Sequence, residues 1–317
     1  MINIEYRHMN KSIYWYGALI FVMIVWATVY PITKMIVSNV DPLFISFLRY
    51  LIGLVPIAPF FIHEVRKNRV KFKRNELIEM SLIGLLGVTA FALFLFYGIE
   101  LSTASNGSLL ANTQPIFTTL IAPLIISESF SFSRILGAVI GLVGISLVVT
   151  GGNFTHLDLS EGHYLGNFLL VLSALSMSVY SILIKKHIAN YGGLIPTFIT
   201  MVSGVLFLSL PILIIENGFG SILSISLHDW LLLAYVGVVG TAIVYLMFNS
   251  ALKHLGVIRS VGFKLFIPVF GVLFSVLMLG EKPGFFIILG ALIVIGAVYF
   301  IQRVPGKTKA VNSMNVL

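Results

Sequence analysis

Charge is scarce in this sequence: only 10% of its 317 residues are charged, whereas about 25% is usual in soluble domains. Hydrophobic residues make up 58% of the chain, and the mean hydropathy is +1.02. A water-soluble globule of this length needs more polar surface than such a chain can supply. The composition therefore excludes a soluble enzyme, a nucleic-acid-binding protein and a disordered chain.

Cysteine is absent altogether, which excludes disulfides, thiolate chemistry and zinc sites built on cysteine. The sequence has no GxxxxGKS or GxxxxGKT motif of an ATP-driven motor, and no HExxH motif or histidine cluster that would hold a metal. It also lacks the clustered carboxylates, histidines or nucleophile–base pair that a membrane enzyme would need. We therefore expect no cofactor, no metal and no enzymatic activity.

Long hydrophobic runs dominate the chain instead. A helix needs about 20 apolar residues to cross the hydrocarbon core of a bilayer, and ten runs of that order follow one another along the sequence. We expect an all-α membrane protein with ten transmembrane helices, between a segment at 1–12 and a tail at 303–317. The expected spans are 13–33, 42–62, 76–97, 104–126, 133–150, 165–184, 194–215, 229–250, 258–279 and 284–302.

The sequence repeats itself at a spacing of about 153 residues. Pro115 precedes Glu128 by 13 positions, and Pro268 precedes Glu281 by the same number. Each half, 13–150 and 164–302, then holds five spans, and because five is odd the second half must enter the membrane upside down. Inverted repeats of this kind recur in secondary transporters, where they frame a site near the membrane midplane.

Positive residues are unevenly distributed over the expected loops. Two loops on one side, after the fifth and the seventh spans, contain no lysine or arginine, whereas the loop after the second span is rich in both. Lysine and arginine collect on the cytoplasmic side of membrane proteins. We therefore expect a multi-pass protein of the cell membrane with both termini in the cytoplasm. The net charge of +8 then marks orientation rather than a nucleic-acid partner, and its strongest contributors are Arg66, Lys67, Arg69, Lys71, Lys73 and Arg74.

Several motifs occur in a fixed order. The first span ends WATVYPITK at Lys34, the second span opens with Asp41-Pro42 and carries Arg49, and a proline-to-glutamate stretch closes the fourth and the ninth spans. With these motifs the chain resembles the EamA-type, ten-span branch of the drug/metabolite transporter superfamily over about residues 13–302. The resemblance implies transport of a small metabolite, and amino acids are one of several substrate classes in that superfamily. The chain departs from the family pattern at Ala27 and Ser127, where glycine is usual, and at Ile267, where many relatives have glutamate.

Lys264 is the most conspicuous candidate for a binding residue, because it lies inside the expected ninth span. A lysine there costs about 2.5–3.5 kcal/mol on insertion scales unless its side chain faces a cavity or a partner. We interpret it as a cavity cation that meets a substrate carboxylate or phosphate, or that exchanges a proton. The alternative is a lysine whose head group snorkels to the inner interface.

Polar and aromatic residues on other spans complete the predicted site. Two residues share a face of the fourth span, and three more follow one another at i, i+4 and i+8 in the eighth. We expect these stripes to line a substrate cavity; the alternative is hydrogen bonding between helices. The predicted substrate-binding residues are Lys264, Asn112, Ser108, Tyr245, Thr241, Asn249, Tyr180, Trp26 and Tyr30.

Other singular residues are interpreted as structural. Arg49 is expected to form an ion pair on the outer side, and Lys34 to anchor a span at the interface. Glu128 and Glu281 are each expected to stabilise the positive end of the span that follows. A pair of glycines in the fifth span, Gly137 and Gly141, is expected to pack against another helix.

The combined pattern predicts a secondary active transporter, an exporter in preference to an importer, of a small organic metabolite such as an amino acid or a related compound. It would work by alternating access between the two inverted repeats. The alternative is a non-transporting membrane scaffold or assembly subunit, which would not need polar stripes inside its spans. The expected partners are a small-molecule substrate and the lipid bilayer, with no nucleic acid, and a homodimer is left open.

Overall fold

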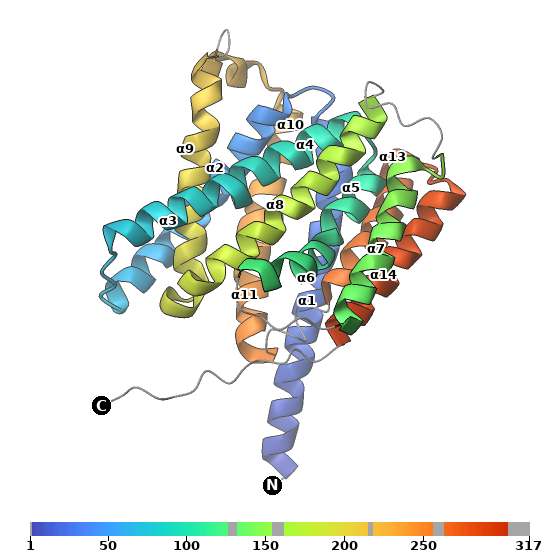
Figure 1. The fold of residues 1–317 in the computed structure, drawn as a ribbon. Helices are drawn as coiled ribbons and strands as arrows, with labels where there is room; N and C mark the ends of the chain where they lie inside the picture. The colour runs from blue at the N-terminus through green and yellow to red at the C-terminus, as the bar shows by residue number, and fades with distance from the viewer. Residues whose placement is uncertain (1, 126–131, 154–161, 215–217, 256–262, 304–317) are drawn as a thin grey trace.

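The computed structural model describes residues 2–125, 132–153, 162–214, 218–255 and 263–303. This part of the chain is helical and contains no strand (Figure 1). Eight of its helices are long and apolar enough to cross a membrane, and two shorter apolar helices follow at Phe266–Leu279 and Phe285–Ile301. The prediction of an all-α membrane protein is therefore confirmed. The segment 303–317 lies outside the described residues, apart from the backbone of Arg303.

The first five crossings occupy residues 2–150. The third crossing is continuous but changes its winding midway, where a π-helical segment joins two α-helices, and the fourth contains one turn of 3₁₀-helix. The elements are α1 (Ile2–Ile36), α2 (Pro42–Lys67), α3 (Arg74–Gly84), η1 (Leu85–Ala90), α4 (Phe91–Leu101), α5 (Ala104–Leu110), η2 (Ala111–Thr113), α6 (Gln114–Ile125) and α7 (Phe132–Thr150).

The second five crossings follow the same plan. Their third crossing again contains a π-helical segment, and the described part of their fourth again contains a 3₁₀ turn. The elements are α8 (Gly162–Tyr191), α9 (Leu194–Ile214), η3 (Gly218–Ser224), α10 (Leu227–Ala234), η4 (Tyr235–Ile243), α11 (Val244–Leu255), η5 (Phe263–Leu265), α13 (Phe266–Leu279) and α14 (Phe285–Arg303).

Helix starts follow local sequence signals. Pro42 occupies the first position of α2, where a missing N–H does no harm, and the Asp41 carboxylate accepts a hydrogen bond from the backbone N–H of Leu43 at 2.7 Å. Ser226 caps α10 in the same way, by accepting from the N–H of Asp229 at 3.1 Å. Side chains thus satisfy amides that have no partner inside the helix.

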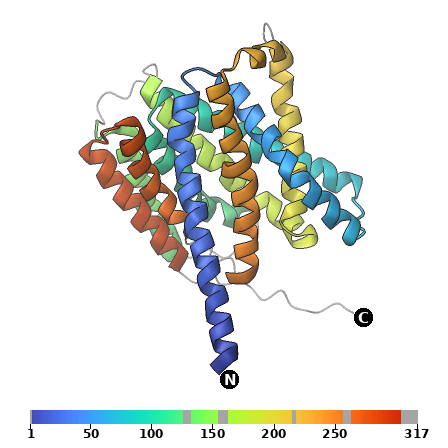
Figure 2. The ribbon, with the colours of Figure 1, turned by 180° about the vertical axis from the view of Figure 1, so that it is seen from behind.

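Packing between the halves obeys a pseudo-two-fold symmetry. α1 packs against α11 and α13 of the second half, and α8 packs against α4 and α6 of the first (Figure 2). α2 pairs with α9 and α7 with α14, which are corresponding helices of the two halves. In Figure 1, α1 rises from the N-terminus whereas α8 descends from the upper right, so the two repeats enter in opposite directions.

The outward faces of the helices are apolar and exposed. Side chains such as Val55, Leu124 and Leu277 are at least 70% exposed. A soluble monomer rarely exposes such an extended apolar surface. Lipid contact accounts for it, and the polar residues are left to the interior.

The pair α7 and α14 crosses closely because glycines face one another. A Cβ added at Gly290 would lie 2.7 Å from the carbonyl oxygen of Gly144, and one at Gly144 would lie 2.9 Å from that of Gly290. Gly137 and Gly141 also face this neighbour, with Ile301 and Ala297 respectively within contact distance of an added Cβ. The expectation that these two glycines pack helices together is confirmed.

We predict that Gly290→Ala lowers stability by about 1–3 kcal/mol, because the added methyl group must push apart two backbones. Gly296 is the matched control, since it lies on the same helix and has nothing within 4 Å of an added Cβ. Gly296→Ala should leave the melting temperature of the detergent-purified protein unchanged or raise it. Equal effects of the two substitutions would contradict the close crossing.

Candidate functional site

A cavity of about 340 Å³ lies between the two repeats. Its wall is formed by residues of α1, α2, η1 and α4 and of the η2 turn from the first half, and of α8, α9, η4 and α11 and the start of the ninth crossing from the second. This volume is in the range of pockets that bind small organic molecules. Both repeats contribute, so a molecule in the cavity touches both.

Seven of the nine predicted binding residues line this one cavity. Ser108 does not: it is fully buried, its hydroxyl donates to the carbonyl of Ser105 at 2.9 Å, and its side chain lies against Gly271. It packs α5 on α13, and its hydrogen bond stays within α5, so neither cavity lining nor hydrogen bonding between helices describes it. Asn249 belongs to α11, but its side chain lies outside the described residues. The seven lining residues are Trp26, Tyr30, Asn112, Tyr180, Thr241, Tyr245 and Lys264.

Lys264 reaches the cavity from η5, next to two aromatic faces. Its Nζ lies 5.7 Å from the ring centroid of Trp26 and 5.4 Å from that of Phe248. Aromatic rings attract a cation through their negative faces, more strongly where water is excluded. Among the described residues no carboxylate forms an ion pair with Lys264, so its charge is directed at the cavity with only aromatic support.

Arg49 is a second cation in the cavity wall, and the expected ion pair on the outer side was wrong. Its Nε donates to the hydroxyl of Thr241 at 3.0 Å, and its guanidinium carbon lies 5.5 Å from the Tyr50 ring and 5.6 Å from the Phe96 ring. No carboxylate pairs with it among the described residues. Asp41, one expected partner, instead caps α2. A buried arginine inside a span is itself a signal of function, which the sequence already offered.

The π-helical segments shape the cavity wall. In η4, Thr241 donates its hydroxyl to the carbonyl of Val236 at 2.9 Å while it accepts the bond from Arg49. In η1, the ring of Tyr180 packs directly on Gly87. A Cβ added at Gly87 would lie 2.0 Å from this ring. The widened turns thus place one cation and one aromatic ring, and they do so in corresponding segments of the two repeats.

Amide and hydroxyl groups of the wall bond to one another. Asn112 donates to the Tyr30 hydroxyl at 2.8 Å, and Gln114 donates to the Ser181 hydroxyl at 2.7 Å. Tyr245 shares a short hydrogen bond with Thr197. Gln114, Ser181 and Thr197 also line the cavity but are not among the predicted binding residues, because only the folded structure turns them inward. Of the polar groups in the wall, the two cations are the charged ones.

The cavity extends toward one end of the molecule. Its lining includes Ile188 in the last turn of α8 and Thr197 in the first turn of α9. Toward the other end it stops at Tyr30 and Leu95, six residues before α1 and α4 end. The end toward which the cavity extends is the side on which α1 begins (Figure 1), and we call it the open end.

At the opposite end two charged side chains, one from α1 and one from the link between α13 and α14, bind the backbone of the α4–α5 link. The Lys34 ammonium donates to the carbonyls of Ile99, Glu100 and Ser102 at 2.7, 2.7 and 2.5 Å. These carbonyls end α4, where a cation is favoured.

Glu281 acts on the other end of the same link. Its carboxylate oxygens accept from the N–H groups of Ala104 at 2.8 Å and Ser105 at 2.9 Å. Glu281 was expected to stabilise the helix that follows it in sequence; it caps α5 of the other half instead, because the pseudo-symmetric packing brings that helix start closer. Glu128 lies outside the described residues. We name the contacts of Lys34 and Glu281 with this link the outer clamp.

Comparisons with known proteins give a consistent picture. The EamA-like transporter family matches the chain over residues 13–150 and again over 164–303. The "Uncharacterized transporter YdfC" of Bacillus subtilis is 27% identical over 87% of this chain and 86% of its own length. The "Probable terminal-alkyne amino-acid exporter" of Streptantibioticus cattleyicolor is 24% identical over 90% of this chain and 92% of its own. One crystal structure shares the fold, with a TM-score of 0.58 and 16% identity, over 90% of this chain and 96% of the other.

We predict that Lys34→Met weakens the outer clamp and exposes the cavity to the side of the α4–α5 link. Because the chain has no cysteine, Met177→Cys in the cavity wall provides a single thiol for labelling. The loss of charge-assisted hydrogen bonds should raise its labelling by an impermeant maleimide from that side by about tenfold.

Lys185→Met is the matched control, since Lys185 is the repeat counterpart of Lys34 at an offset of 151 positions and is exposed at the other end. It should not raise labelling from the side of the link. An unchanged rate in Lys34→Met would show that the clamp does not close the cavity.

Proposed function

The chain belongs to the EamA-like transporter family, and from this premise we propose that it is a secondary active transporter that exports a small organic metabolite of the amino-acid class. It works by alternating access: the inverted repeats rock about the cavity, which faces first one side of the membrane and then the other. The relatives named as transporters support the class of protein. The relative named as an amino-acid exporter supports the direction and the substrate class.

The observation that carries the substrate class is the charge of the cavity. Arg49 comes from the first repeat and Lys264 from the second, and no aspartate or glutamate is among the described lining residues. A substrate carboxylate would form charge-assisted hydrogen bonds there, which are stronger than neutral ones. Trp26, Tyr30 and Tyr180 would bound the space left for an apolar side chain.

A carboxylate held by both cations would also connect the two repeats. In that state each half is tied to the other through the substrate, whereas in the empty state neither cation is paired with a carboxylate among the described residues. Substrate binding therefore favours conformations in which the halves close on it. This is the differential interaction that a population shift requires.

We also propose that the open end of the cavity faces the cytoplasm of the cell membrane. The loop after α2 on that side carries the strongest concentration of lysine and arginine, from Arg66 to Arg74, and positive residues accumulate on the cytoplasmic side. α1 begins and α14 ends at this same end (Figure 1). An exporter then receives its substrate in the conformation that the structure describes.

We predict that Lys264→Ala reduces transport of amino acids with a free carboxylate by about tenfold or more, because a charge-assisted contact with the carboxylate is lost. The measurement is flux of the twenty standard amino acids into proteoliposomes, with and without an imposed pH gradient. Lys264→Arg keeps the charge and should retain part of the flux. Lys282→Ala removes a lysine exposed outside the cavity and serves as the matched control.

The two results that oppose this assignment are distinct. Wild-type flux with undiminished flux in Lys264→Ala would remove Lys264 from the site. No wild-type flux of any amino acid under any gradient would instead favour another metabolite or the scaffold alternative.

The orientation gives a further prediction. A C-terminal fusion to a reporter that is active only in the cytoplasm should be active, whereas a fusion to a reporter that needs the outer side should be inactive. Fusions ending after Gly152, in the link between the halves, should give the opposite pattern. A C-terminal reporter that is active only outside would refute the topology.

A further inference from the structure

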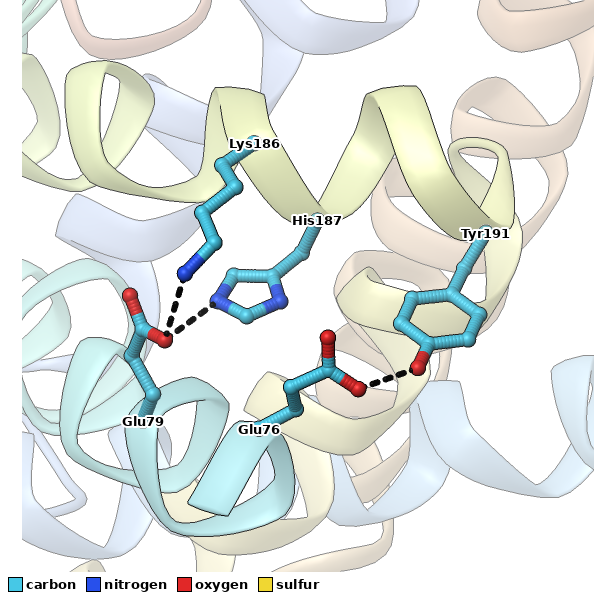
Figure 3. Close-up of polar contacts among 5 residues, drawn as sticks. All are labelled: Glu76, Glu79, Lys186, His187 and Tyr191. Atoms are coloured by element: carbon cyan, nitrogen blue, oxygen red, sulfur yellow. Dashed lines mark hydrogen bonds and ion pairs between the residues drawn. The ribbon is translucent and has the colours of Figure 1, made fainter. Parts of the chain in front are cut away.

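A cluster of ionisable side chains joins the start of α3 to the end of α8, outside the cavity (Figure 3). The Glu79 carboxylate oxygen Oε2 lies 3.2 Å from Lys186 Nζ and 3.4 Å from His187 Nε2. One turn further along, the Tyr191 hydroxyl donates to Glu76 at 2.5 Å. All five side chains lie toward the end at which the cavity is open, and none of them lines the cavity.

His187 is the unusual member of this cluster. Its side chain is 0% exposed, and neither ring nitrogen makes a hydrogen bond with any described residue. A buried polar atom without a partner costs free energy, so the ring would gain from a partner at either nitrogen. Protonation would give Nε2 a positive N–H beside the Glu79 carboxylate, at a distance already short enough for an ion pair.

The charges around His187 come from two elements. α3 supplies Glu76 and Glu79, with Lys73 directly before the helix, and α8 supplies Lys186 and Tyr191. Glu76 lies on the other side of the His187 ring from Glu79 (Figure 3). α9 packs against both helices, but its residues Leu194–Ile214 include no ionisable side chain. The ring thus lies between two carboxylates, and Lys186 neutralises one of them only in part because it is largely exposed, at 63%.

We propose that His187 and Glu79 form a proton-binding site that fastens α8 to α3 and makes exposure of the cavity depend on the pH at its open end. Histidine is the side chain that ordinarily changes charge between about pH 5 and 8. The proton reaches the buried ring by way of Glu79, whose side chain is 44% exposed. When the proton binds, the only covalent bond formed is the N–H of the ring, and the contact between His187 and Glu79 becomes an ion pair.

The site acts on the cavity through α8. Ile184 and Ile188, one turn before and one residue after His187, both line the cavity near its open end. Alternating access, on which this inference rests, requires the ends of helices around that opening to move. A proton that fastens α8 to α3 favours the conformation in which the opening exists, because the ion pair forms only while these two helices are together.

The test measures labelling of the Met177→Cys thiol by an impermeant maleimide from the open end of the cavity, in reconstituted protein. Each rate is divided by the rate of the same protein carrying His187→Gln at the same pH, which cancels the pH dependence of the thiol itself. We expect this ratio to rise about threefold as the pH falls from about 8 to about 5.5. A ratio that stays flat would overturn the proposal.

Two further variants make the outcome specific. His163→Gln removes an exposed histidine at the other end of α8, and it should keep the full pH response. Glu79→Gln leaves His187 in place but removes its carboxylate partner, so it should abolish the response even if His187→Gln folds poorly. A full response in Glu79→Gln would refute the pair.

Labelling needs no substrate, so failure of the proton site and failure of the proposed substrate class can be told apart. A pH response without amino-acid flux would support the site and count against the substrate class. Amino-acid flux without a pH response would support the substrate class and count against the proton site.

Discussion

Every backbone N–H and C=O inside a bilayer needs a partner within the protein, because lipid offers none. Regular helices meet this requirement by themselves, and each departure from regular helix must be met by a side chain. At η1 the hydroxyl of Ser176 donates to the carbonyl of Leu86, and at η4 the hydroxyl of Thr241 donates to that of Val236. Beside η2, Ser178 donates to the carbonyl of Gln114. The interruptions therefore lie where polar side chains can reach them, which is also where the cavity is.

The same requirement explains why the two repeats matter together. Each repeat has a π-helical segment in its third crossing and a 3₁₀ turn in its fourth, and these two turns, Ala111–Thr113 and Phe263–Leu265, place Asn112 and Lys264 at an offset of 152 positions. Corresponding positions therefore carry an amide in one half and an ammonium in the other. The symmetry gives the two walls of the site the same backbone geometry. The side chains on the two walls differ in chemistry.

The outer clamp shows that corresponding residues of the two repeats have different surroundings in this conformation. Lys34 holds three carbonyls at the closed end, whereas its counterpart Lys185 is exposed at the open end. Two repeats with like sequence features in unlike surroundings are what alternating access requires. The clamp joins α1, the α4–α5 link and the α13–α14 link, so its release would free elements of both halves at once.

Much of this could be predicted from the sequence, because the signals are local or periodic. Apolar runs give the spans, the recurrence from Pro115 to Glu281 gives the repeats, and the cost of a charge in lipid singles out Lys264. What escaped prediction depends on which helices meet. Ser108 shares a helix face with Asn112, yet α13 covers it. Glu281 precedes α14 in sequence but caps α5, and Arg49 turns from the expected outer carboxylates to Thr241 because η4 lies beside α2.

The two cavity cations limit what the protein can bind. Had the chain paired Arg49 or Lys264 with a carboxylate of its own, the empty protein would be more stable, but an anion would have to displace that carboxylate before it could bind. Aromatic faces support both cations without competing for their hydrogen bonds. The aromatic contacts thus lower the cost of placing the two cations in the membrane and leave them available to a ligand. In the function we propose, an anionic substrate would bind to these two charges, and both repeats would then contact the same molecule.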